Sequence, residues 1–206
     1  MRIFVPFTAA AMLVACSRQD NTNEGSEEVP APAAATAEAT PDAAMSFDCA
    51  AARGQAEQAV CADASLAALD RLAAPGDAAL AGQRNACGRA DDLKGCLTEV
   101  YATQIATRAK GGKKLAGVTG PLAYDCAGVK VEATYVAEPS LAIVSGSGIT
   151  AVLTRAVAAS GERYEGVSEG APIELWTKGK EAKLSHGSER RQCSASEPSI
   201  DAKAAS

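Results

Sequence analysis

Histidine and aromatic side chains are scarce in this sequence of 206 residues, which has one histidine, one tryptophan, four tyrosines and three phenylalanines. The histidine, His186, lies in a turn-like Ser-His-Gly-Ser stretch. The sequence also lacks a nucleophile elbow, a phosphate-binding loop and a zinc motif. It therefore predicts a protein that is not an enzyme and that has no cofactor, no metal site and no small-molecule substrate. A catalytic pair formed by Ser160 and His186 is the enzyme alternative.

Basic residues are also too few for a nucleic-acid-binding protein. The chain has 20 Lys and Arg against 25 Asp and Glu, which gives a net charge of -5. Residues 17–45 contain six acidic residues and one arginine, so most of the negative charge lies in this segment. A nucleic-acid partner would require a basic patch or stripe, and none is expected. A strongly cationic protein would be attracted to the acidic segment only weakly, because salt screens exposed charges.

No hydrophobic run is long enough to span a bilayer. Residues 3–15 are apolar but too short to cross a hydrocarbon layer of about 30 Å as a helix. They follow the positively charged Met1-Arg2 and end in Leu13-Val14-Ala15-Cys16, which resembles the cleavage motif of lipoprotein signal peptides. We therefore expect residues 1–15 to be a signal peptide and Cys16 to be the lipidated first residue of the mature chain. An ordinary secretory signal with an incidental Cys16 is the alternative.

The expected anchor predicts a location in the bacterial cell envelope. Acyl chains on Cys16 would hold the protein stably, since each buried CH₂ contributes about 0.8 kcal/mol. Ser17 rather than Asp follows the cysteine, which by resemblance to lipoprotein sorting favours the outer membrane, on the side facing the periplasm. Residues 16–45 are polar beyond the cysteine and rich in Pro and Ala, with no apolar period. They predict a disordered stalk.

With so few large aromatic side chains, small domains stabilised by disulfides are expected rather than one large core. Apolar residues at helical spacing predict helices in residues 46–110, and Asp63 or Ser65 can cap one of them. The four cysteines of this segment most simply pair as Cys49–Cys61 and Cys87–Cys96, although four cysteines allow three connectivities. A thiolate metal site is the alternative, and it would require reducing conditions.

Three short stretches give this segment a resemblance to a known family. Phe47-Asp48-Cys49, Cys61-Ala62-Asp63 and Leu69-Asp70 resemble the N-terminal helical domain of LprI-type proteins. The resemblance implies a helical module that is linked to lysozyme inhibition in some proteins. The chain departs from the family at Pro75-Gly76, which interrupts a helix, and at Gln83–Cys87, which lacks the family's tryptophan.

The apolar period then changes from helical to strand-like. Residues 111–119 contain two glycines and no periodicity, and we expect a hinge there. From Val129 to Tyr135 apolar and polar residues alternate, which predicts a half-buried antiparallel strand. Six or more short strands punctuated by glycines predict a small barrel or sandwich in residues 120–196, followed by a tail at 197–206. The expected fold class is α+β in two domains.

Two stretches resemble the signature of the MliC family, the bacterial envelope inhibitors of c-type lysozyme. Ala159–Gly166 contains the family's Ser-Gly-x-x-Tyr turn, and Ile173–Lys180 contains its strand ending in Trp-x-Lys-Gly. Cys126 and Cys193 correspond to the family's disulfide. The resemblance covers about residues 120–196 and implies an eight-stranded antiparallel β-barrel.

The resemblance also implies that Ser160 and Lys178 enter the cleft of c-type lysozyme and meet its catalytic glutamate and aspartate, with Gly161 and Tyr164 completing the binding motif. Charge-assisted hydrogen bonds from an ammonium to these carboxylates are strong in a site shielded from water. Ser160 and Lys178 are 18 positions apart, farther than in typical relatives, because of residues 167–172. We expect this insertion to shift Ser160 or to add a second contact. A non-inhibitory envelope module that binds peptidoglycan or another protein is the alternative function.

The anchor can be tested by replacing the cysteine. Cys16→Ser removes the only thiol to which a diacylglycerol could be attached at the cleavage motif, so the variant should be unacylated and soluble or uncleaved. Fractionation of cells and mass spectrometry of the N-terminal peptide measure both properties. Unchanged partitioning of the variant into membranes would exclude a lipid anchor at this position.

Overall fold

The computed structural model describes residues 44–73 and 76–195. The expected signal peptide, Cys16, nearly all of the stalk, Pro75 and the tail at 197–206 lie outside the described residues. Within the described residues, no helix has both the length and the apolar character needed to cross a membrane.

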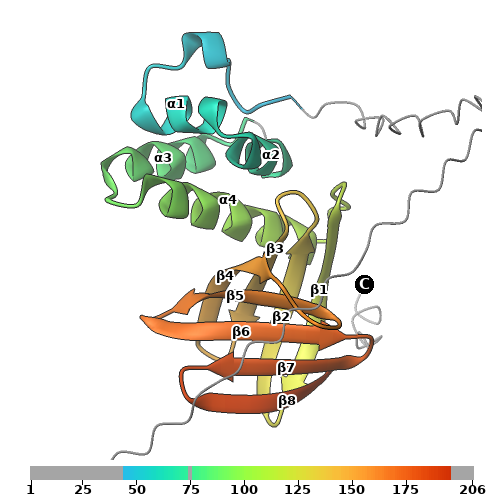
Figure 1. The fold of residues 1–206 in the computed structure, drawn as a ribbon. Coiled ribbons are helices and arrows are strands. Elements are labelled where there is room, and N and C mark those ends of the chain that lie inside the picture. The colour runs from blue at the N-terminus through green and yellow to red at the C-terminus, as the bar shows by residue number, and fades with distance from the viewer. Residues whose placement is uncertain (1–43, 74–75, 196–206) are drawn as a thin grey trace, which may run out of the picture. The chain divides into compact units, whose positions relative to one another are not determined.

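The first part of the described chain is helical (Figure 1). Its elements are η1 (Cys49–Ala51), α1 (Gln55–Ala62), α2 (Ala64–Leu72), α3 (Ala78–Ala86), η2 (Cys87–Arg89) and α4 (Leu93–Lys110). Aspartates begin three of the helices, because a carboxylate can accept hydrogen bonds from backbone N–H groups that have no partner inside the helix. Asp63 accepts from two N–H groups of α2, Asp77 from two of α3 and Asp92 from one of α4.

Two disulfides cross-link the elements of this helical part. Cys49 is bonded to Cys61, which joins η1 to α1, and Cys87 is bonded to Cys96, which joins η2 to α4. These are the simplest pairs among the connectivities that the sequence leaves open. They confirm the predicted disulfide-bonded helical region.

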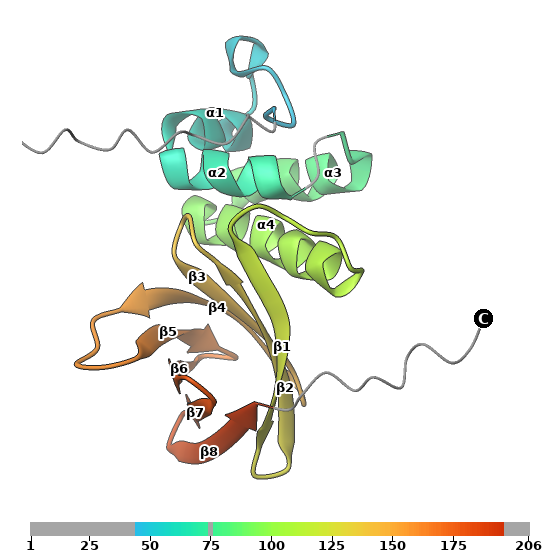
Figure 2. The same cartoon turned by 90° about the vertical axis from the view of Figure 1, so that its right-hand side faces the viewer.

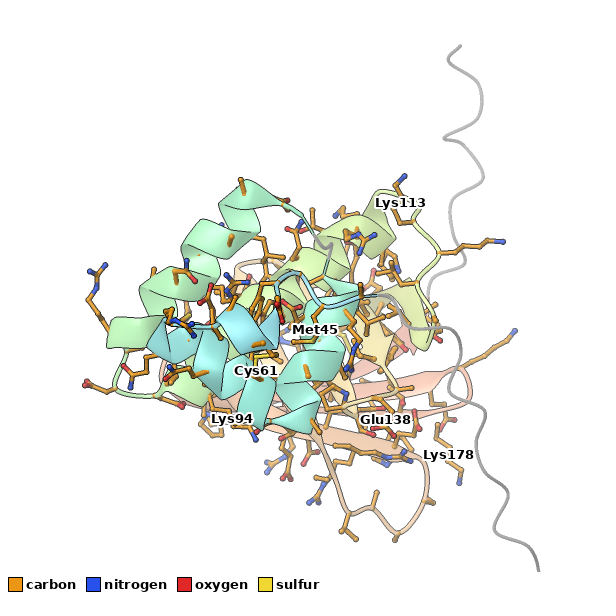
Figure 3. The ribbon with its side chains drawn as sticks, turned by 90° about the horizontal axis from the view of Figure 1, so that it is seen from above. Met45, Cys61, Lys94, Lys113, Glu138 and Lys178 are labelled. Atoms are coloured by element: carbon orange, nitrogen blue, oxygen red, sulfur yellow. A yellow bond between two sulfur atoms is a disulfide. The ribbon has the colours of Figure 1, made fainter. Side chains whose placement is uncertain are left out.

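A buried polar network ties the start of the described chain to the helices. Asp70 of α2 is fully buried and accepts two hydrogen bonds from Ser46, one from the backbone N–H at 2.7 Å and one from the hydroxyl at 2.6 Å. Arg84 of α3 donates to the Ser46 hydroxyl at 3.0 Å and pairs with Glu57 at 3.0 Å. Met45, which precedes Ser46, packs against the same helical core (Figure 3). The network therefore fixes the place where the upstream chain joins the helices.

The second part of the described chain is the predicted eight-stranded antiparallel barrel (Figures 1 and 2). Each strand pairs with the next, and β8 pairs with β1. The strands are β1 (Val118–Cys126), β2 (Val129–Val136), β3 (Leu141–Gly146), β4 (Ile149–Ala156), β5 (Glu162–Ser168), β6 (Ala171–Lys178), β7 (Glu181–His186) and β8 (Glu189–Ala195).

The two strands that close the barrel are joined by few backbone pairs and one covalent bond. β1 and β8 are in register at Tyr124 with Ala195 and at Asp125 with Ser194. A disulfide between Cys126 and Cys193 lies next to this short seam. In the chain-entropy model, a cross-link that closes a loop of this length contributes roughly 4 kcal/mol to stability.

One outer face of the barrel is covered by the helices. Val136, Leu141 and Ile143 point away from the barrel interior and share a hydrophobic cluster with buried residues of α4 such as Leu97 and Ile105. An ion pair of 2.7 Å between Lys110 and Glu132 lies at the same contact. The apolar faces of the helices and of the barrel therefore stabilise one another.

The contact between the helices and the barrel explains why β2 and β3 depart from the predicted alternation of buried and exposed residues. In β2, residues 129–133 alternate as expected, but Thr134 is 3 % and Val136 2 % exposed although they lie on the outer face. In β3, all four residues of the run 141–144 are buried. The last two residues of the expected hinge, Val118 and Thr119, belong to β1, and residues 111–117 connect α4 to this strand.

The buried network predicts a stability effect at Ser46. Ser46→Ala removes the hydroxyl that lies between Asp70 and Arg84, and it leaves a buried carboxylate with one donor fewer. We expect the free energy of unfolding to fall by about 1–3 kcal/mol, measured by urea denaturation of the mature chain. Ser194→Ala, at an exposed position of β8, is the matched control and should change it by less than about 0.5 kcal/mol. Equal effects of the two substitutions would contradict a structural role for the network.

Candidate functional site

The Ser-Gly turn and the lysine of the expected binding motif lie side by side at one end of the barrel. Ser160 and Gly161 precede β5, and Lys178 is the last residue of β6. These strands form an antiparallel hairpin in which Glu162 pairs with Thr177. A Cβ atom placed on Gly161 would lie 3.2 Å from the Cβ of Lys178. The structure thus brings together three of the four residues predicted for binding, and all three are exposed.

The long separation of Ser160 and Lys178 in the sequence does not separate them in space. β5 and β6 are paired in continuous register from Glu162–Thr177 to Ser168–Ala171. Additional residues lengthen both strands of such a hairpin equally, so its open end keeps the same geometry. The insertion at 167–172 lies at the opposite end of the hairpin. The hairpin therefore keeps Ser160 beside Lys178. A second contact from residues 167–172 stays a prediction, and it would lie at the other end of the hairpin.

Gly161 is required by the close approach of the turn to β6. Its φ of +71° lies in the left-handed region, and a Cβ atom there would be 2.3 Å from the carbonyl oxygen of Thr177. A side chain would thus be strained by its φ and would also clash with backbone. The absence of a side chain is what allows Ser160 to lie against the end of β6.

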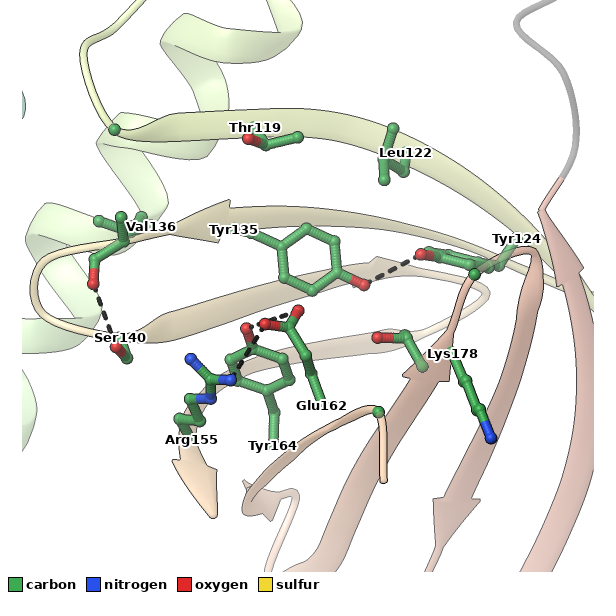
Figure 4. A pocket seen from close by; sticks show the side chains of 15 residues that line it. Thr119, Leu122, Tyr124, Tyr135, Val136, Ser140, Arg155, Glu162, Tyr164 and Lys178 are labelled. Atoms are coloured by element: carbon green, nitrogen blue, oxygen red, sulfur yellow. Dashed lines mark hydrogen bonds and ion pairs between the residues drawn. The ribbon is translucent and has the colours of Figure 1, made fainter. Parts of the chain in front are cut away.

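Among the residues that the structure describes, Lys178 has no partner for its charge. It is exposed, and no ion pair joins it to another described residue. Thr177, Lys178 and Gly179 contribute to the lining of a pocket of about 570 Å³ at this end of the barrel. Figure 4 shows that the side chain of Lys178 extends away from the tyrosines of this pocket. An exposed ammonium at the rim of a concave surface is available to a partner.

Three tyrosines and an ion pair form the wall of this pocket (Figure 4). The hydroxyls of Tyr124 and Tyr135 are 3.0 Å apart, and the rings of Tyr135 and Tyr164 are 5.5 Å apart. Glu162 pairs with Arg155 at 3.2 Å and accepts a hydrogen bond of 3.4 Å from the Tyr164 hydroxyl. Tyr164, the fourth residue predicted for binding, is 5 % exposed and lies in the barrel core.

Sequence reasoning did not identify Tyr124, Tyr135, Arg155 or Glu162 as residues of this end of the barrel. The alternation in residues 129–135 placed Tyr135 on the buried face but did not show at which end of the barrel it lies. Glu162 directly follows the Ser-Gly turn, and this position in the sequence is the signal that could have placed it at the binding end of the barrel. Tyr124 and Arg155 come from β1 and β4, and no local pattern shows that these two strands place them at the same end of the barrel.

The hydroxyls of Tyr135 and Tyr164 stay neutral at physiological pH. Burial raises the pKa of Tyr135 and, to a smaller extent, that of Tyr164, because the interior disfavours the charged phenolate. The neighbouring hydroxyl of Tyr124 adds to the pKa increase of Tyr135, and the carboxylate of Glu162 adds to that of Tyr164.

Ser160 and His186 do not form a catalytic pair. His186 pairs with Ile173, which is five residues before Lys178 on β6 and hence about 16 Å from the binding end along the strand. The ring of His186 is instead 3.2 Å from the carbonyl oxygen of Ser168. Among residues 44–73 and 76–195, no group of three or more His, Cys, Asp or Glu side chains could hold a metal ion.

Comparison with known proteins gives one family. Residues 124–191 match the MliC family, described as membrane-bound lysozyme-inhibitor of c-type lysozyme. The matched segment contains Ser160, Gly161, Tyr164 and Lys178, and it ends before Cys193. No curated protein and no solved structure matches the chain significantly. The match is to a family of inhibitors, not of enzymes, and it covers most of the barrel but none of the helical part.

The raised tyrosine pKa values predict a loss of stability in alkali. A tyrosine whose pKa is higher in the folded than in the unfolded state contributes fully below the unfolded value of about 10, and this contribution is lost as the pH rises towards the folded value. We expect the free energy of unfolding to decrease from about pH 10 upwards, and Tyr135→Phe to reduce the slope. Urea denaturation at a series of pH values measures this slope. An unchanged slope in Tyr135→Phe would show that burial of this hydroxyl does not cause the loss.

Proposed function

We propose that this protein binds and inhibits c-type lysozyme by placing Ser160 and Lys178 in the active-site cleft of the enzyme. The observation that carries the proposal is the exposed Lys178, which forms no ion pair with another described residue and lies beside the Ser160-Gly161 turn at one end of a closed barrel. The family matched by residues 124–191 supports the same target.

The chemistry of the target explains why these two side chains suffice. Lysozyme cleaves a glycosidic bond with two carboxyl groups, one of which acts as the acid and the other as nucleophile or stabilising charge. The ammonium of Lys178 donates charge-assisted hydrogen bonds to these groups in a cleft from which water is excluded. The hydroxyl of Ser160 donates to one carboxylate or accepts from its protonated form. Occupancy of the cleft blocks the substrate, so the inhibitor performs no reaction.

Gly161 and Tyr164 hold Ser160 and Lys178 in position. Gly161 allows the turn to approach β6, and Tyr164 packs in the barrel core two residues after the start of β5. We assign to both a role in holding the binding surface, in which Ser160 and Lys178 make the contacts to the enzyme.

The proposal places the barrel on a membrane-anchored chain. The motif before Cys16 and the description of the matched family as membrane-bound support an anchor. We place the protein at the outer membrane, facing the periplasm, and we assign residues 46–110 to an LprI-like helical domain and residues 120–196 to the inhibitory domain. The outer barrel face shared with α4 indicates that the helical domain stabilises the inhibitory one.

Replacement of the lysine tests the mechanism. Lys178→Ala removes the ammonium at the end of a strand, where alanine can keep the backbone conformation. It should weaken binding of c-type lysozyme by about 2–5 kcal/mol, which corresponds to roughly 30-fold to several-thousand-fold in affinity. Ser160→Ala should cost less, about 1–3 kcal/mol. Titration calorimetry and a lysozyme activity assay on the mature chain measure both.

Lys180→Ala is the matched control, because it removes the same charge from an exposed turn two residues away. It should bind within about threefold of the unmodified protein if rim charges contribute little. Lys183 is a poorer control, since its ammonium lies 5.1 Å from the ring of Trp176. Equal losses for Lys178→Ala and Lys180→Ala would mean that net charge drives binding and would refute insertion of Lys178.

A further inference from the structure

Trp176, the only tryptophan of the chain, makes the hydrogen bond that holds the Ser160 turn. Its indole N–H donates to the carbonyl oxygen of Ser160 at 2.9 Å. Outside the strand ladders, it is the one hydrogen bond between residues 157–161 and another element of the described chain. Val157, four residues before Gly161, is 90 % exposed and adds no packing to the turn.

The ring of Trp176 also lies close to the turn at Gly161. A Cβ atom on Gly161 would lie 3.2 Å from Cε2 of the indole and 3.2 Å from the Cβ of Lys178. The turn therefore fits between the indole and the lysine, which share one face of β6 because they are two residues apart on a strand.

Trp176 is held in place by its neighbours on both adjacent strands. It pairs with Arg163 of β5 and with Lys183 of β7. The ammonium of Lys183 lies 5.1 Å from the centre of the indole ring, within the range of a cation–π interaction. Arg163 is oriented by carboxylates, with Glu165 at 2.8 Å and Glu174 at 3.9 Å. The indole is thereby fixed on the outside of the barrel.

A role in the core does not account for this residue. Trp176 belongs to neither hydrophobic cluster of the described chain, and its ring is half-buried on the outer face of β6, while Leu175 and Thr177 point inwards. Its contacts are with the turn and with charged side chains of the neighbouring strands.

We infer that Trp176 is a positioning residue, which holds the Ser160-Gly161 turn against Lys178 so that both inhibitory side chains point in a fixed relative direction. The inference rests on the proposed function, since it names the residue that prepares that site for binding. Preorganisation of this kind raises affinity because the ordering cost is met before the partner arrives. Trp176 acts through Ser160 and needs no contact with lysozyme.

A double-mutant cycle tests whether Trp176 acts through Ser160. Trp176→Phe keeps an aromatic ring and removes the N–H donor. It should weaken binding of c-type lysozyme about fivefold to tenfold in the unmodified protein, as expected for loss of one hydrogen bond. In the Ser160→Ala background the same change should cost less than about twofold, because residues that act together are not additive. An equal loss in both backgrounds, or no loss in either, overturns the inference.

Lys183→Met separates the hydrogen bond from the charge above the ring. It keeps the aliphatic stem and the indole N–H, so binding should stay within about twofold of the unmodified protein. A loss as large as that of Trp176→Phe would assign the effect to the cation and overturn the role of the N–H.

A readout on the free protein distinguishes failure of this inference from failure of the proposed function. In ¹⁵N relaxation measurements, the backbone amides of Ser160 and Gly161 should have order parameters typical of a rigid backbone, and Trp176→Phe should lower them towards loop values below about 0.6. If the unmodified protein does not bind lysozyme, the proposed function fails while this result still decides the inference. Unchanged order parameters in Trp176→Phe overturn it in either case.

Discussion

Continuous pairing of β5 with β6 determines where the candidate binding residues lie. The hairpin is in register over its whole length, so the residue before its first strand and the last residue of its second strand meet at the open end. Gly161 completes this arrangement, because only a residue without a side chain fits the space between the turn and β6. The site is thus a consequence of backbone pairing. Within the described chain, the side chains of Lys178 and Ser160 form no hydrogen bond or ion pair that binding of a partner would have to break.

The barrel and its neighbours show which parts of the structure can be predicted from the sequence. The alternation in residues 129–135 and the glycine-punctuated strands correctly predicted antiparallel sheet, because a strand records in its own sequence which face is buried. The pocket wall could not be predicted in the same way. Tyr124, Arg155 and Glu162 come from three different strands, and their meeting depends on register around a closed sheet, which no single strand encodes.

The contact between the helices and the barrel could also not be predicted from the sequence. Leu141 and Ile143 are outward-facing residues of β3 that would be solvent-exposed on an isolated barrel, yet both are 3 % exposed. In the sequence they belong to a continuous apolar run, which is compatible with a strand buried on both faces. Such a run does not identify the element that covers it. α4 is that element, and it is apolar on more than one side because it packs against the other helices and the barrel.

The seam between β1 and β8 has the fewest paired positions of any neighbouring strands in the described barrel, two against three for β4 and β5. β1 is paired with β2 at seven positions but with β8 at two. If the Cys126–Cys193 bond were reduced, separation of these strands would convert a sheet without edges into one with two unpaired edges. Unpaired strand edges are templates for pairing with another chain. The disulfide therefore does more than stabilise the fold, because it keeps the edges of β1 and β8 joined to each other.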